Sequence, residues 1–159
     1  HIVLIAAALI IVALLMWLGE KVGTREKPLT RISFADSLVV GLAQAFALLP
    51  GVSRSGSTIT AGLFRNMTRE AAVRFSFLLS TPLIAGAALL KGYEVHKEGL
   101  PAGMQAPFIV GIVVSAIVGY ATIAWLIRYL QSNTLRVFIV YRIVVGIVVI
   151  GLAYVWHLQ

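Results

Sequence analysis

The chain has 159 residues, of which 60% are hydrophobic and only 12% are charged. A soluble domain keeps about 25% charged residues, so this composition excludes a soluble globular domain and predicts an integral membrane protein. The formal net charge of +7 does not indicate nucleic acid as a partner, because the cations lie in loops beside apolar segments and report membrane topology. The sequence has no cysteine, which excludes disulfides, thiolate metal sites and cysteine nucleophiles.

Four apolar segments are predicted to cross about 30 Å of hydrocarbon as helices. They cover residues 2–19, 69–90, 106–127 and 137–157, and the polar stretches 91–105 and 128–136 are predicted as loops. We therefore expect an all-α fold, a polytopic membrane helix bundle that forms one domain over residues 1–159.

The segment 34–64 does not divide into two ordinary spans. Its apolar stretches, 34–49 and 53–64, are short for full crossings at a rise of about 1.5 Å per residue. They are separated by Pro50-Gly51, and both outer flanks are basic. We expect a re-entrant helical hairpin that enters and leaves on one face, with its tip at 50–55 near the middle of the membrane. Irregular backbone is tolerated there when protein buries it or when it lines a wet cavity.

The cations would then gather mainly on one side of the membrane. By the positive-inside rule that side is cytoplasmic, and both chain ends lie outside. Two full crossings in place of the hairpin would leave this sidedness unchanged but would put 50–58 in an exterior loop. One side collects Lys21, Arg25, Lys27, Arg31, Arg65, Arg69, Arg74, Arg128 and Arg136, and the other collects Lys91 and Lys97.

The hairpin tip carries the most informative residues of the chain, Pro50–Thr58. An Arg at the centre of an inserted helix costs about 2.5–3.5 kcal/mol on insertion scales, so Arg54 needs a compensating partner. If Ser53 begins a new helix, the free N–H groups of its first turn form an anion site, and the guanidinium of Arg54 matches phosphate oxygens. The predicted phosphate-binding residues are Gly51, Ser53, Arg54, Ser55, Gly56, Ser57 and Thr58.

Two residue types in this reading have ordinary structural alternatives. Ser and Thr in membrane helices often donate to the carbonyl of residue i−4, which would remove them from a binding role. Arg142, in the last predicted span, either reaches back to the cytoplasmic face or contacts the hairpin within the bundle.

The sequence PGVSRSGST at 50–58 resembles the PGxSRSGxT motif of the undecaprenyl-pyrophosphate phosphatase family of the bacitracin-resistance type. The resemblance covers the second half of a family member, and the opening His1 also suggests a fragment or one half of a longer protein. Its further matches are Arg69, Ala72, residues 75–80 (FSFLLS), Pro82, Tyr141 and Arg142.

The resemblance implies one half of an inverted-repeat architecture in the bacterial inner (plasma) membrane. The implied activity hydrolyses undecaprenyl pyrophosphate, an isoprenyl pyrophosphate lipid, to undecaprenyl phosphate and phosphate in cell-wall carrier recycling. The implied catalytic residues are Arg54, Ser53 and Ser55, with Arg54 holding the pyrophosphate. Either serine could act as a nucleophile, but no base in this chain is placed to activate one.

The family's first half carries a glutamate-rich stretch and a Ser-Ser-Thr-Gly-His motif that this chain does not contain. The implied cofactor, Mg²⁺ or Ca²⁺, would therefore be held by a missing N-terminal half, and we expect no metal ligand here. The expected partners are the lipid substrate, the bilayer and that half; the resemblance also allows a homodimer.

A transporter or flippase for a phosphorylated lipid or another anion is the alternative. Discontinuous helices whose N-termini meet anions inside the membrane also occur in transporters with inverted repeats. Release of phosphate from a lipid pyrophosphate in detergent distinguishes the enzyme from the transporter.

Overall fold

The computed structural model describes residues 2–101 and 103–157, with side chains up to Val155. Within these ranges all regular structure is helical, which confirms the all-α prediction. The helices are α1 (Ile2–Val22), η1 (Leu29–Arg31), α2 (Phe34–Ala45), η2 (Phe46–Leu48), α3 (Arg54–Phe64), α4 (Arg69–Glu98), α5 (Gln105–Ser132) and α6 (Arg136–His157).

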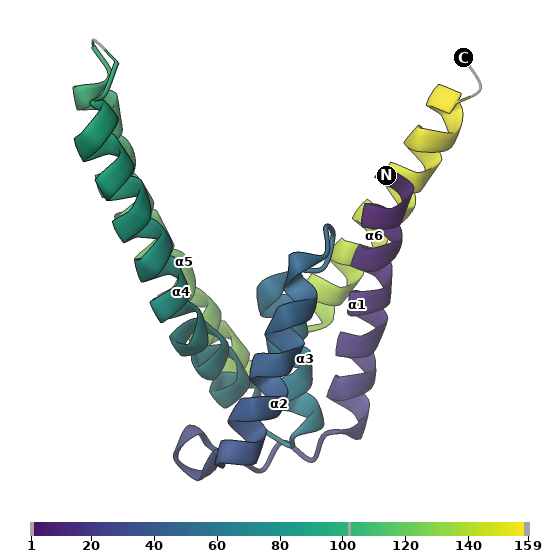
Figure 1. The fold of residues 1–159 in the computed structure, drawn as a ribbon. Helices are drawn as coiled ribbons and strands as arrows, with labels where there is room; N and C mark the ends of the chain where they lie inside the picture. The colour runs from purple at the N-terminus through teal and green to yellow at the C-terminus, as the bar shows by residue number, and fades with distance from the viewer. Residues whose placement is uncertain (1, 102, 158–159) are drawn as a thin grey trace.

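The helices form two diverging arms with a short hairpin between them (Figure 1). One arm is the pair α4 and α5, and the other is the pair α1 and α6. The hairpin consists of α2 and α3, and α3 contacts α1, α2 and α4. Because α3 is surrounded in this way, its residues from Thr58 to Leu63 are buried, and Ile59, Ala61 and Leu63 among them belong to the hydrophobic core.

Among the residues that the structure describes, four helices are long and apolar enough to cross a membrane, namely α1, α4, α5 and α6, which fits a multi-pass membrane protein. The connections 91–105 and 128–136 are shorter than predicted, because α4 continues to Glu98 and α5 to Ser132. Charge does not end α4: Lys91 pairs with Glu94 one turn on, at 2.6 Å. The helix ends at Gly99, whose φ of +76° favours glycine.

Helix α3 and the turn before it lie alongside α1. At the base, a Cβ built on Gly19 would lie 3.2 Å from Cβ of Leu63. At the turn, Gly51 has a φ of +89°, and a Cβ built there would lie 2.8 Å from Cα of Ile5. The chain thus enters and leaves the hairpin at one end of α1. The turn contacts Ile5, which lies in the first half of α1. Gly56, farther along in α3, lies against Val12 near the middle of α1.

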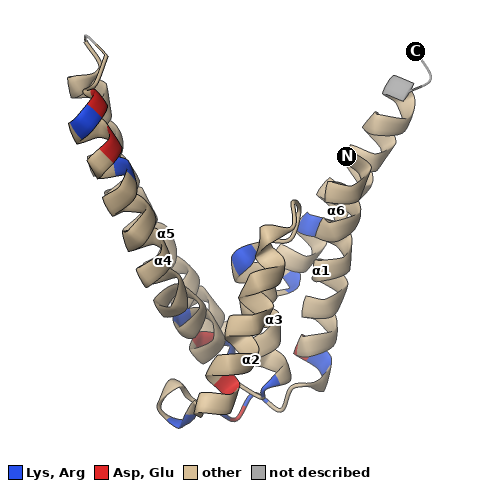
Figure 2. Ribbon diagram, in the orientation of Figure 1, with Lys and Arg blue, Asp and Glu red and all other residues tan. Residues whose placement is uncertain are grey.

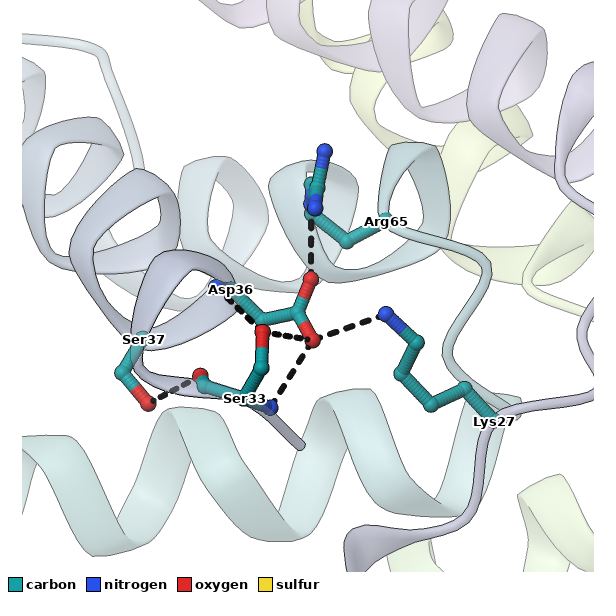
Figure 3. A network of polar contacts seen from close by, with 5 residues as sticks. All are labelled: Lys27, Ser33, Asp36, Ser37 and Arg65. Atoms are coloured by element: carbon teal, nitrogen blue, oxygen red, sulfur yellow. Dashed lines mark hydrogen bonds and ion pairs between the residues drawn. The ribbon is translucent and has the colours of Figure 1, made fainter. Parts of the chain in front are cut away.

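Charged residues gather at the base of the hairpin and at the far end of α4 (Figure 2). At the base, Asp36 is fully buried and accepts from Lys27 Nζ and Arg65 Nε, each at 2.7 Å (Figure 3). The Ser33 N–H and hydroxyl also donate to it, each at 2.9 Å. Burial alone would raise the pKa of Asp36, but the hydrogen bonds from Lys27, Ser33 and Arg65 hold it below its ordinary value.

A second ion pair joins α1 to α4 near the same end. Arg69 donates through Nε and Nη2 to the two carboxylate oxygens of Glu20, at 2.6 and 2.7 Å. Oε1 of Glu20 also accepts from the N–H of Leu135, just before α6, at 3.4 Å. These contacts bring the ends of three helices together at the base.

Candidate functional site

The N-terminus of α3 has the form that its sequence predicts. Ser53 is the N-cap, and its hydroxyl accepts from the N–H of Gly56 at 3.2 Å. Among the described residues, the N–H groups of Arg54 and Ser55 have no acceptor. These two N–H groups and the positive end of the helix dipole make the start of α3 suitable for an anion.

The hydroxyl groups of the motif separate into two sets. Those of Ser53 and Ser55 lie 3.3 Å apart and line one cavity. The Ser57 and Thr58 hydroxyls instead donate to the carbonyl of Arg54, at 3.0 and 2.8 Å. The structural alternative for Ser and Thr therefore applies to Ser57 and Thr58, whose hydroxyls donate within α3.

Thr58 has a second contact, which sequence reasoning missed. Its hydroxyl lies 2.6 Å from the hydroxyl of Ser76 on α4, and both side chains are buried. The only signal for this contact was the position of Ser76 in the otherwise apolar start of α4. The pair fixes α3 against α4 one turn beyond the capped end.

A cavity of about 230 Å³ opens beside the start of α3. It brings Ser53, Ser55 and Gly56 together with Arg142 on α6. Arg142 is only 9% exposed, so of its two predicted alternatives the structure shows the contact with the hairpin. The other lining residues are Met16, Ile59, Leu126, Leu130, Leu135, Phe138 and Tyr141.

Two further residues of the predicted site, Arg54 and Gly51, do not line this cavity. Arg54 is partly exposed, and its guanidinium has no hydrogen bond or ion pair to the part of the chain that the structure describes. Gly51 packs against the backbone of Ile5 at the turn, so its role is to let the tip approach α1 closely.

Residues 1–148 match the protein family described as bacitracin resistance protein BacA. The chain belongs to the BacA family. It is 50% identical over 149 residues to an undecaprenyl-diphosphatase of Thermomicrobium roseum, an alignment that covers 94% of this chain and 54% of that protein. It is 48% identical to an undecaprenyl-diphosphatase of Trichormus variabilis, covering 92% of this chain and 46% of that protein. For one of Synechocystis sp. the identity is 47%, and the coverage is 92% and 45%.

These findings confirm the resemblance drawn from Pro50–Thr58. The chain spans about half the length of the curated relatives that it matches. The part of a BacA protein seen here includes the capped start of α3 and the cavity beside it.

The two most buried acidic side chains that the structure describes are held in separate ion pairs. Among the described residues, no three His, Asp or Glu side chains come together to hold a metal ion. The buried Asp36 is bound by Lys27 and Arg65, and Glu20 is bound by Arg69. The residues that line the cavity beside α3 include no carboxylate and no imidazole, so they also offer no general base.

Proposed function

We propose that this chain forms the phosphate-binding part of an integral membrane phosphatase of the bacterial inner membrane. The enzyme hydrolyses undecaprenyl pyrophosphate to undecaprenyl phosphate and inorganic phosphate. The observation that carries the proposal is the start of α3, where Ser53, Arg54 and Ser55 present hydroxyl groups, free N–H groups and a guanidinium beside a cavity. The names of the relatives, undecaprenyl-diphosphatase, support the choice of substrate.

In the proposed reaction an oxygen nucleophile bonds to the terminal phosphorus, and the bond from that phosphorus to the bridging oxygen breaks. The electron pair of that bond stays on the lipid phosphate, and water supplies the oxygen and protons that complete inorganic phosphate. Negative charge on the transferred group is stabilised by Arg54 and by the N–H groups at the start of α3. The hydroxyls of Ser53 and Ser55 donate hydrogen bonds to phosphate oxygens.

The proton transfers and the divalent cation belong to a second half of the protein in this proposal. The cavity beside α3 has no carboxylate or imidazole in its lining, and the described acids do not fit Mg²⁺ or Ca²⁺ as a group. We therefore route no step through a cation held by this chain. The role left to these residues is to bind and orient the pyrophosphate.

The test is phosphate release from undecaprenyl pyrophosphate by the whole protein in detergent. Arg54→Ala should lower turnover by about 100-fold or more, while the melting temperature and the far-ultraviolet circular dichroism stay those of the parent protein. Arg74→Ala is the matched control, because Arg74 is half exposed on α4 and pairs with Glu70 at 2.8 Å. It should retain parental turnover.

Near-normal turnover in a folded Arg54→Ala variant would remove Arg54 from the proposed role. A parent protein that binds the lipid pyrophosphate and moves it across a vesicle membrane, without releasing phosphate, would favour the transporter and overturn the phosphatase.

A further inference from the structure

Arg142 is a buried cation without a partner. It is 9% exposed, and its Nε and Nη2 atoms are buried with no hydrogen-bond acceptor in the described chain. The other well-buried ionic groups differ in this respect, because Asp36 and Glu20 both have close cationic partners. A guanidinium stays charged in proteins, and an uncompensated buried charge is strongly destabilising. Arg142 therefore calls for an anion that the described chain does not supply.

The position of Arg142 indicates where that anion binds. A Cβ built on Gly56 would lie 2.8 Å from Nη1 of Arg142 and 3.2 Å from Cβ of Ser53. The guanidinium thus lies against the first turn of α3, in the space that a side chain at position 56 would fill. Arg142, Ser53 and Ser55 line the same cavity of about 230 Å³.

The described residues that line this cavity supply no anionic partner for Arg142. The chain has six acidic residues, and none of them lines the cavity. The groups that converge there are instead donors: hydroxyls, the first N–H groups of α3 and the guanidinium. Such a set suits an anion with several oxygen atoms, and two separate donor groups suit an anion with two charged centres.

We propose that Arg142 is a second phosphate-binding residue of this site. It binds one phosphoryl group of a pyrophosphate, while the start of α3 binds the other. The inference deepens the proposed function and rests on it for the identity of the substrate. It also gives Gly56 a specific role, since only glycine leaves Nη1 its place beside α3.

The test compares two soluble probes that differ by one phosphoryl-like group, methylenediphosphonate and inorganic phosphate. Their affinities are measured by calorimetry on the whole protein in detergent. Arg142→Gln should weaken the diphosphonate at least 10-fold and phosphate less than 3-fold. Arg54→Ala should weaken both probes. Arg136→Gln is the matched control, because Arg136 is exposed at the start of the same helix, and it should change neither affinity.

A melting experiment without ligand separates this role from a structural one. Arg142→Gln should melt no lower than the parent protein, because it removes an unpaired buried charge. Gly56→Ala should reproduce the selective loss of the diphosphonate by displacing the guanidinium. Gly41→Ala serves as its control, since a Cβ on Gly41 meets nothing within 4 Å.

An unchanged diphosphonate affinity in Arg142→Gln, or an equal loss for both probes, would overturn the inference. If the parent protein still released phosphate from undecaprenyl pyrophosphate, that failure would leave the proposed function intact. The converse is also distinguishable: selective loss of the diphosphonate with no phosphate release by the parent would support the anion site and overturn the phosphatase.

Discussion

Asp36→Asn tests what holds the base of the hairpin together. The substitution keeps the shape of the side chain and an oxygen that can accept from Ser33, but it removes the negative charge between Lys27 and Arg65. Those cations lie 2.7 Å from the carboxylate oxygens, on the loop before α2 and at the end of α3. In the variant, an amide N–H₂ group must also face a donor, so one or both contacts break.

The size of the loss follows from the exposure of the three side chains. Asp36 is fully buried, and removing one partner of a buried ion pair costs about 3–5 kcal/mol. Lys27 and Arg65 keep 27% and 41% of their side-chain exposure, so water can solvate them when the carboxylate is gone. We therefore expect a loss of about 2–4 kcal/mol, which lowers the melting temperature by about 5–15 °C in a chain of this length.

The assay is thermal unfolding in detergent, followed by circular dichroism, with Glu94→Gln as the control. Glu94 pairs with Lys91 at 2.6 Å, but both side chains are largely exposed, and such pairs contribute about 1 kcal/mol or less. If Asp36→Asn melted within 2 °C of Glu94→Gln (roughly the effect of 1 kcal/mol), the buried network would not stabilise the hairpin and the argument would fail.

The dependence on pH gives the same argument a second test. The pKa of Asp36 lies below its ordinary value in the folded protein, so the unfolded chain takes up the proton first as the pH falls. The stabilisation is therefore complete above the ordinary carboxyl pKa of about 4 and is lost as the pH falls below it. The difference in melting temperature between the parent and Asp36→Asn should shrink from pH 5 downward. A difference in melting temperature that stayed constant down to pH 3 would refute the assignment of this stabilisation to the Asp36 carboxylate.

Two further substitutions test the tip and the core. Gly51→Ala should lower the melting temperature, because φ is +89° and the methyl group would collide with the backbone of Ile5; a melting temperature equal to that of Gly41→Ala would contradict this. Thr58→Val should cost about 1–2 kcal/mol, because it leaves the buried Ser76 hydroxyl without its partner at 2.6 Å. Thr81→Val, which removes only an exposed bond to the carbonyl of Phe77, is its control, and an equal loss in both variants would show that the buried pair adds nothing.

Local signals in the sequence predicted the helix starts well. Ser53 is the N-cap of α3 as expected, because a hydroxyl before a helical segment satisfies a free N–H of the first turn, and Thr68 caps α4 in the same way. The hairpin also followed from local features, namely two short apolar stretches separated by Pro50-Gly51. The end of α4 did not follow from local features. Lys91 and Glu94 are charged residues after an apolar span and so indicate a loop, but both residue types also suit an exposed helix.

Long-range partners could not be predicted from the sequence. Nothing near Asp36 in the chain indicated Arg65, and nothing near Gly56 indicated Arg142. Periodicity assigns a residue to a helix face, but the helix that this face meets depends on the whole packing arrangement. For the same reason Ser57 and Thr58 were expected to bind phosphate, although their hydroxyls bond within α3.

Contacts at both ends of the hairpin hold the start of α3 in place, and they thereby position its donor groups for a ligand. At the base, Asp36 ties α2 to the end of α3, and at the tip Gly51 packs on Ile5. The donors at the start of α3 are therefore held in place before a ligand arrives, which is the condition under which fixed dipoles stabilise charge most strongly. Arg142 comes to the same place from α6, so the proposed site depends on packing between α6 and α3. A peptide that contained only the hairpin would keep the motif and lose the guanidinium of Arg142.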